Sequence, residues 1–489
     1  MRRKELLLLT AAMSVLTLVL LVLIGCGGSG GPISTPPPKQ PGQSEQFLQL
    51  LPAAQRTATY VGSDKCGDCH GGGHGGGTGK IDIAAFNNTL HSQAGLGCES
   101  CHGPASIHNA NPTKDNILTY PLVTRTAVCA QCHGPKSSAF DVSKHAEIVE
   151  SVKDEAEKNP AVYGKNCFRC HSAAFRTQYV DAKLSSGMTR DEVHAGIVAL
   201  SDQEIIKTAQ LSQESATCVN CHEPHKKTGN LTEAGKDKHL MRKIFSMDGT
   251  DISPGAPIAQ HTTVNHICGS CHNSRGGRND DASINTSTAR PPFHNGPQYN
   301  MLLGIGGVEG SGPPIRTTAH SETPGQCVHC HMPQGRHTFT TSFDTSCQPC
   351  HTPGDADARS AIKGAIELQL FSLRTRMENW ARSRFGDPDM WDYTALIAAR
   401  QKTAPPQAQV PIEIKRARHN YYFVLRDQSL GIHNSAYTRH LLNVANQNLD
   451  SLGVGRAAPP PPGRGQDYVR RVLQEDIRIG NIAARSEKD

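Results

Sequence analysis

Eight copies of one short pattern, Cys-x-x-Cys-His, constrain this chain of 489 residues more than any other feature. They use sixteen of the seventeen cysteines, and a histidine directly follows the second cysteine of every pair. Numbered 1 to 8 along the chain, the motifs are Cys66/Cys69/His70, Cys98/Cys101/His102, Cys129/Cys132/His133, Cys167/Cys170/His171, Cys218/Cys221/His222, Cys268/Cys271/His272, Cys327/Cys330/His331 and Cys347/Cys350/His351. Any fold must satisfy eight identical sets of two thiols and one imidazole.

Three other uses of paired cysteines fit this pattern less well. Disulfides in exported proteins need no histidine, structural zinc sites use two such pairs per metal or a separated histidine pair, and redox dithiols occur once per domain. The pattern is typical of c-type haem attachment, in which two thiols add to the vinyl groups of one porphyrin. The following histidine then becomes the proximal iron ligand. The sequence therefore predicts eight covalently bound haems c.

The composition is too poor in apolar side chains for a conventional core along the whole chain. Hydrophobic residues make up 37 % and aromatic residues 5 %, beside 46 glycines and 31 prolines. Eight haems between residues 66 and 351 leave about 36 residues for each porphyrin, so the porphyrins must lie close together and supply apolar area. We expect a mainly α fold with much irregular loop, organised around packed haems.

Helical periodicity is clearest towards the C-terminus. An apolar stripe of Ile362, Ile366, Leu370, Leu373, Met377 and Trp380 predicts a long amphipathic helix over 359–384. The other predicted helices are 191–213, 389–402 and 412–450, the last with a break near Gly431. The segment after the proline tract 459–462 is left open between one helix and disorder.

The first residues have the pattern of an export signal. Three basic residues precede the apolar run 6–24, and Leu23-Ile24-Gly25-Cys26 resembles a bacterial lipoprotein box, in which Cys26 would carry the lipid. An uncleaved anchor and a plain signal remain alternatives. By resemblance to Gram-negative sorting rules, Gly27 favours the outer membrane. The predicted regions are a signal peptide (1–25), a lipidated Gly/Pro-rich tether (26–58), an octahaem-binding region (59–355), a C-terminal helical region (356–453) and a Pro-rich linker with tail (454–489).

The net charge of +6 would change sign in the mature protein. Removing residues 1–25 deletes three bases and one acid, and two propionates per haem then bring the charge to about −12. A nucleic-acid partner therefore has no electrostatic basis. Cationic electron donors and mineral surfaces are the better expectations.

The sixth ligand of each iron decides between carrier and catalyst, because an iron with two histidines is closed to substrate. Sixteen histidines lie outside the motifs. The eight candidate distal ligands, chosen by their sequence context, are His91, His108, His145, His225, His294, His320, His337 and His433, with His239, His261, His266 and His419 in reserve.

Several segments resemble the multihaem cytochrome superfamily of cytochrome c554, pentahaem nitrite reductases and octahaem oxidoreductases. They include Tyr60-Val61-Gly62-Ser63-Asp64-Lys65-Cys66, Cys98-Glu99-Ser100-Cys101-His102-Gly103-Pro104, Cys330-His331-Met332-Pro333 and Asp427-x-Ser429-x-Gly431-Ile432-His433-Asn434. The resemblance implies that histidines such as the eight candidates bind haems attached elsewhere in the sequence. The lysine-ligated active haem of nitrite and tetrathionate reductases is absent, whereas the tyrosine crosslink of hydroxylamine oxidoreductases stays open. A lipidated, all-histidine octahaem chain resembles outer-membrane cytochromes of metal-reducing bacteria.

The resulting expectation is an electron carrier rather than an enzyme, with no catalytic residues and with bis-histidine haems. Its partners would be other c-type cytochromes or redox proteins, extracellular metal oxides, and the membrane through its lipid. An enzyme acting on a small nitrogen or sulfur species through one open haem is the alternative. A homo-oligomer or filament is compatible with the carrier.

Overall fold

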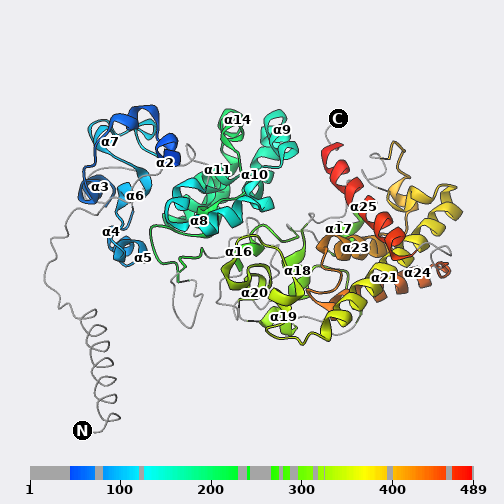
Figure 1. Ribbon diagram of the computed structural model, residues 1–489. Helices are drawn as coiled ribbons and strands as arrows, with labels where there is room; N and C mark the ends of the chain where they lie inside the picture. The colour runs from blue at the N-terminus through cyan, green and yellow to red at the C-terminus, as the bar shows by residue number, and fades with distance from the viewer. Residues whose placement is uncertain are drawn as a thin grey trace, which may run out of the picture. The chain divides into compact units, whose positions relative to one another are not determined.

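The computed structural model describes residues 45–71, 81–119, 126–229, 239–242, 266–274, 279–286, 296–311, 318–323, 325–393, 400–458 and 465–486. Within these ranges the chain is helical with long irregular connections, as the sequence predicts (Figure 1). The described residues form no β-strand, and only an isolated antiparallel bridge joins His222 to Met241. Cys26, residues 27–44 of the predicted tether and His294 lie outside the described residues, whereas the last residues of that region, 45–58, form a short helix and a 3₁₀ turn, with Phe47 and Leu51 buried.

The motif-bearing region consists of short helices. They are α2 (Glu45–Leu50), α3 (Ser63–His70), α4 (Ile83–Asn87), α5 (Leu90–Gln93), α6 (Cys98–His102), α7 (Ser106–Ala110), α8 (Ala127–Asp141), α9 (Glu150–Lys158), α10 (Lys165–His171), α11 (Ala173–Arg176), α12 (Ala182–Ser185), α13 (Arg190–Val198), α14 (Asp202–Leu211), α15 (Cys218–Cys221), α16 (His266–Gly269), α17 (Asp281–Thr286), α18 (Gln298–Leu303), α19 (Ala319–Glu322) and α20 (Gln326–His331). Helices this short are unstable alone in water, so they depend on what they pack against.

Protein side chains supply little of that packing around the first motifs. Helices α3, α4, α5 and α7 contain no buried residue. The clear exception surrounds motif 4, where Phe168, Phe175, Val180, Ile197 and Ile205 form a closed apolar cluster between α10 and α14. This distribution agrees with a region whose remaining apolar contacts come from a bound group.

The C-terminal region has a conventional core. It consists of α21 (Asp355–Phe385), α23 (Ile412–Asp427), α24 (Ser435–Ser451) and α25 (Gln466–Ser486), which lie side by side in Figure 1. The predicted stripe on α21 supplies the fully buried Ile366, Leu370, Leu373 and Met377. The segment after the proline tract, which the sequence left open between a helix and disorder, forms helix α25, and this helix packs on α21.

Two buried carboxylates tie these helices together. Asp476 of α25 accepts hydrogen bonds from Arg374 Nε at 2.7 Å, Arg400 at 3.0 Å and the Tyr421 hydroxyl at 2.6 Å. Asp392 accepts from Arg418 Nε at 2.7 Å in the same way. Each carboxylate is fully buried and compensated by cations, which is the condition under which a buried charge is tolerated.

The helix predictions were correct in part. The break near Gly431 is confirmed, since the chain leaves α23 at Asp427 and enters α24 at Ser435. The predicted helix 191–213 is two helices, because Ser201 and Glu204 form a capping box that starts α14 anew.

The predicted helix 389–402 was wrong where the structure describes it. Residues Pro388–Trp391 form a 3₁₀ turn, and residues 400–406 are not helical. The turn places the Trp391 ring against Tyr421 and Tyr422, at 5.5 and 5.9 Å between ring centres. Burial of this indole therefore outweighs local helical periodicity.

No helix among the described residues combines the length and the apolar character that crossing a bilayer requires.

The buried Asp476 predicts a specific stability effect. Asp476→Asn removes the fully buried counter-charge that Arg374 and Arg400 share and leaves them only their partly exposed partners Glu378 and Asp389, so we expect it to lower the free energy of unfolding by about 3 kcal/mol. Denaturant unfolding followed by far-ultraviolet circular dichroism measures this change. The matched control, Glu475→Gln, removes a neighbouring exposed ion pair with Arg478 and should leave the midpoint unchanged. Equal midpoints for the two variants would contradict the role given to Asp476.

Candidate functional site

The attachment motifs lie on single turns of helix that put all three side chains on one face. Cysteines three residues apart and a histidine one residue later share a helical face. The motif is closed by its own backbone, because the histidine N–H donates to the first cysteine's carbonyl at 2.8 Å in His222 and at 2.9 Å in His272 and His351. Two sulfurs can thus follow one porphyrin edge with the imidazole beneath the iron.

All sixteen motif cysteines are free thiols. None is fully buried, and one cysteine in each of motifs 1, 2, 3 and 8 is exposed, namely Cys69, Cys101, Cys132 and Cys350. Free, accessible thiols in pairs fit covalent attachment of a porphyrin and not a disulfide framework.

The most informative geometry is a set of facing imidazoles. In seven places among the described residues, a motif histidine faces a histidine from another part of the chain, with ring centres 6.0 to 6.3 Å apart. The pairs are His70–His108, His102–His225, His133–His91, His222–His337, His272–His145, His331–His433 and His351–His320.

This separation fits one iron atom between two rings. Two Fe–N bonds of about 2 Å each place the centres of the two imidazoles about 6 Å apart. The described residues contain no cluster of three or more His, Cys, Asp or Glu side chains able to hold a metal alone. A haem iron needs only two protein ligands, since the porphyrin supplies the other four, so paired imidazoles suffice.

Seven of the eight candidate distal ligands take part in these pairs, each with a different motif histidine. The eighth candidate, His294, lies outside the described residues, so its role stays a prediction, as does the distal ligand opposite His171. The reserve candidate His419 is buried in the C-terminal core, where its Nε2 contacts the Gly306 carbonyl at 3.0 Å.

Hydrogen bonds orient these rings for metal binding. Six of the paired imidazoles donate Nδ1–H to a backbone carbonyl, which leaves Nε2 free for iron. The bonds are His102 to Leu118 (2.7 Å), His108 to Thr113 (2.9 Å), His222 to His239 (2.7 Å), His320 to Ile432 (2.7 Å), His331 to Phe339 (3.2 Å) and His337 to Gly335 (3.0 Å).

Burial keeps several of the rings neutral. Loss of contact with water lowers the pKa of His102, His145 and His222 to about 4, with a further contribution from the histidine that each faces. These rings are therefore unprotonated at pH 7, and only a neutral imidazole can bind a metal.

Carboxylates lie near three of the paired rings, His225, His351 and His433, and the closest contact is at His433. His433 Nδ1 lies 2.6 Å from Asp427 Oδ1, and Asp427 is buried. Burial alone would lower the pKa of His433, but the Asp427 charge outweighs it and the pKa is raised. The resemblance noted from the sequence includes the segment 427–434, but it did not reveal the contact between His433 and Asp427. The only sequence signal of that contact is a carboxylate six residues before the histidine.

Glu99, inside motif 2, is another residue whose role sequence reasoning missed. Its carboxylate is buried and accepts from the backbone N–H groups of Val61 at 3.0 Å, Gly62 at 2.8 Å and Ala105 at 2.9 Å. It thus fixes the segment before motif 1 against motif 2. The next turn needs Gly103, with φ +75°, because a Cβ there would lie 2.7 Å from Leu51 Cδ2.

Comparisons with known proteins agree with these sites. A family model described as cytochrome c554 and c-prime matches residues 42–103 and 128–194, which contain motifs 1 to 4. The C-type polyheme cytochrome OmcB of Geobacter sulfurreducens is 29 % identical over 176 residues, which cover 33 % of this chain and 20 % of OmcB.

Two more proteins resemble longer stretches. The multiheme cytochrome MtrA of Shewanella baltica is 24 % identical over 208 residues, 40 % of this chain and 47 % of MtrA. The undecaheme cytochrome from the S-layer of Carboxydothermus ferrireducens covers 74 % of this chain, and this chain covers 51 % of it, at 21 % identity and a TM-score of 0.47. The chain spans less than half the length of OmcB and MtrA. The repeated Cys-x-x-Cys-His motif and the sequence matches identify it as a multihaem c-type cytochrome, distantly related to OmcB and MtrA.

Proposed function

We propose that this protein is an octahaem electron carrier, in which electrons pass through closely packed bis-histidine haems outside the cytoplasm. Each of the eight motifs attaches one haem c and supplies its proximal histidine. The distal ligands are the candidate histidines, seven of them in the pairs described above. The haems supply the redox chemistry, and the protein sets their order and potentials.

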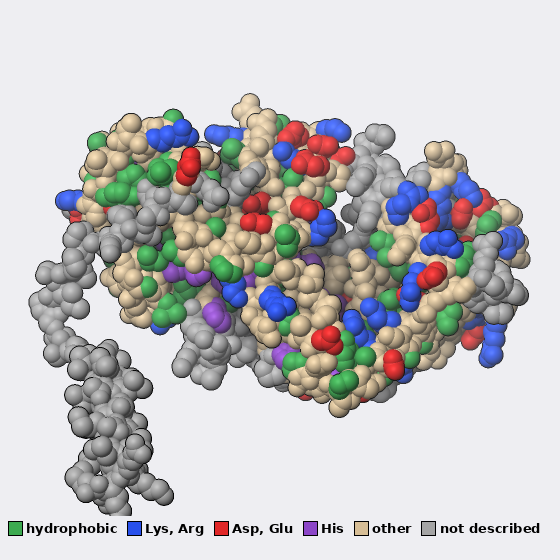
Figure 2. All heavy atoms as spheres, in the orientation of Figure 1, with side chains coloured by type: hydrophobic (Ala, Val, Ile, Leu, Met, Phe, Trp, Pro, Cys, Tyr) green, Lys and Arg blue, Asp and Glu red, His purple; other side chains and the backbone are tan. Residues whose placement is uncertain are grey.

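The seven imidazole pairs are the observation that carries this proposal. An iron with two nitrogen ligands has no free position for a substrate, so it can exchange electrons but does not bind nitrite or hydroxylamine. Several histidine side chains reach the surface on the face drawn in Figure 2, where haem edges would be accessible to redox partners. We infer that these partners are other c-type cytochromes or redox proteins and extracellular metal oxides.

The ligand environments favour unequal potentials. Six of the fourteen paired rings donate to neutral carbonyls, whereas His433 donates to the buried Asp427 carboxylate. A negative charge on that hydrogen bond makes the imidazole a stronger donor and stabilises ferric iron. Haem 7, which has His433 as its distal ligand, should therefore have a lower potential than it would have without Asp427.

The location is proposed from the N-terminal sequence. Cys26 would carry the lipid of an outer-membrane lipoprotein, and the Gly/Pro-rich tether would join it to the haem-binding region. The basic start and apolar run of an export signal support an extracytoplasmic role.

Electron paramagnetic resonance on the oxidised holoprotein tests the carrier directly. After a pyridine haemochrome assay has given eight haems per chain, we expect only low-spin ferric signals, unchanged by nitrite or hydroxylamine, because every iron is closed. A high-spin signal from about one haem in eight that shifts on adding either compound would make the protein an enzyme instead.

Asp427→Asn tests the assignment of unequal potentials. It removes the charge next to His433, so we expect about one eighth of the haem absorbance to titrate at a potential higher by on the order of 60 mV. Spectroelectrochemical titration measures the shift. Asp355→Asn is the matched control, because Asp355 lies 3.8 Å from His351 Nδ1 and is exposed. The assignment is wrong if the two variants titrate alike.

Cys26→Ser tests the lipid anchor. We expect the native protein to enter the detergent phase on Triton X-114 partition and the variant to stay in the aqueous phase, since it cannot accept a lipid. Ser29→Ala, three residues away, should behave like the native protein. If the Cys26 variant still enters the detergent phase, the apolar run 6–24 is an uncleaved anchor.

A further inference from the structure

Cysteines of different motifs lie next to one another, and their neighbours reveal which haems are adjacent. Each motif sulfur is bonded to a porphyrin edge in the holoprotein. Two sulfurs from different motifs that touch therefore bring two porphyrin edges together. The contacts join all eight motifs, but they do not follow the order of the motifs along the chain.

We propose that the haems form a row in the order 1, 2, 3, 5, 6, 7, 8, with haem 4 as a side branch on haem 6. This inference rests on the proposed octahaem carrier and adds the route that electrons take through it.

The first part of the row rests on contacts between motifs 1, 2 and 3. The Cys66 and Cys98 thiols interact directly, and Ser63 Oγ accepts from the Cys98 N–H at 2.9 Å. Glu99 fixes the same two motifs together through the backbone before motif 1. His102 of motif 2 donates to the Leu118 carbonyl at 2.7 Å, and the Leu118 side chain packs with Val128, the residue before Cys129, which places haem 3 next.

The row then omits motif 4. Cys129 of motif 3 interacts directly with Cys218 of motif 5. A second contact agrees, because Lys136, just after motif 3, donates to the Gly335 carbonyl at 2.5 Å. The Gly335 carbonyl in turn accepts a hydrogen bond from His337, and the His337 ring faces His222 of motif 5.

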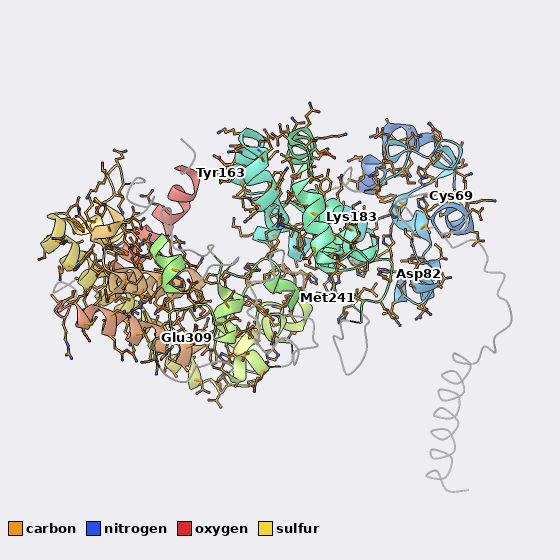
Figure 3. The ribbon with its side chains drawn as sticks, turned by 180° about the vertical axis from the view of Figure 1, so that it is seen from behind. Cys69, Asp82, Tyr163, Lys183, Met241 and Glu309 are labelled. Carbon is orange, nitrogen blue, oxygen red and sulfur yellow. The ribbon has the colours of Figure 1, made fainter. Side chains whose placement is uncertain are left out.

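Motif 6 is the junction. Cys221 and Cys268, from motifs 5 and 6, pack in one apolar cluster with Met241 and with Val328 of motif 7; Figure 3 labels Met241. Cys268 also interacts directly with Cys327 of motif 7. Motif 6 thus contacts motifs 5 and 7 through a single cysteine.

The other cysteine of motif 6 makes the contact with motif 4, the side branch. Cys271 interacts directly with Cys170 of motif 4, and the Cys170 thiol lies 3.9 Å from the Ser270 carbonyl. The buried Arg176, which follows motif 4, donates to Cys271 Sγ at 3.6 Å. Haem 4 therefore meets haem 6 at a different thioether from haems 5 and 7.

The two ends of the row are more open than its junction. Helix α20, which carries motif 7, packs against the turn Phe343–Cys347, which carries the first cysteine of motif 8, and this contact ends the row. Cys350 is exposed, as are Cys69 (labelled in Figure 3), Cys101 and Cys132 towards the other end, whereas motifs 4 to 7 have no exposed cysteine. Electrons can enter and leave at haems 1 and 8, and the junction is shielded.

Replacing single distal ligands tests the order. His145→Met, His433→Met and His320→Met change haems 6, 7 and 8 respectively, and methionine raises the potential of the haem it binds. At an applied potential that reduces only that haem, the iron becomes diamagnetic and its oxidised neighbours lose their dipolar broadening in electron paramagnetic resonance. We expect three neighbours to sharpen for haem 6, two for haem 7 and one for haem 8. Two for haem 6, or two for haem 8, would overturn the order.

Iron positions in the unmodified holoprotein give a second test that needs no variant. Anomalous diffraction at the iron edge should show three irons adjacent to the iron of haem 6 and only one adjacent to the iron of haem 4. An unbranched row in chain order would overturn the proposal. The carrier function fails separately, through high-spin iron in the native protein, whatever the order of the haems.

Discussion

Two imidazoles facing each other at the distance of one iron atom are the interaction on which the motif-bearing region depends. The two members of a pair are often far apart in sequence, as in His102–His225, His145–His272 and His222–His337. Each pair therefore acts as a long-range crosslink once iron is bound, in a region whose short helices bury few side chains of their own. Such a region obtains its tertiary structure largely from its cofactors, as small metal domains do.

The C-terminal helices follow a different principle. Their core of Leu370, Trp391, Tyr421 and neighbouring residues closes on protein side chains alone, and the carboxylates of Asp392 and Asp476 are fully compensated within it. This helical core also positions a candidate haem ligand, because His433 lies in the loop that joins α23 to α24. A ligand held by an independent core is positioned before its metal arrives.

The Cys-x-x-Cys-His motifs can be recognised from sequence because their chemistry is local: Cys66, Cys69 and His70 lie within five residues, and the same holds in every copy. Helix α21 was predictable because its periodicity and its burial agree. The partner of each motif histidine was not, since nothing near His272 in the sequence indicates His145. The helix predicted over 389–402 failed because the burial of Trp391 is decided by tertiary packing.

The seven-residue loop between α23 and α24 contributes to two of the imidazole pairs. It carries His433, which faces His331, and its Ile432 carbonyl accepts from His320, which faces His351. A ligand that binds only the folded state stabilises that state. Binding of haem at the proposed sites 7 and 8 would thus be thermodynamically linked to the packing of α23 and α24, and the stability of the helical core would depend on whether both haems had been attached.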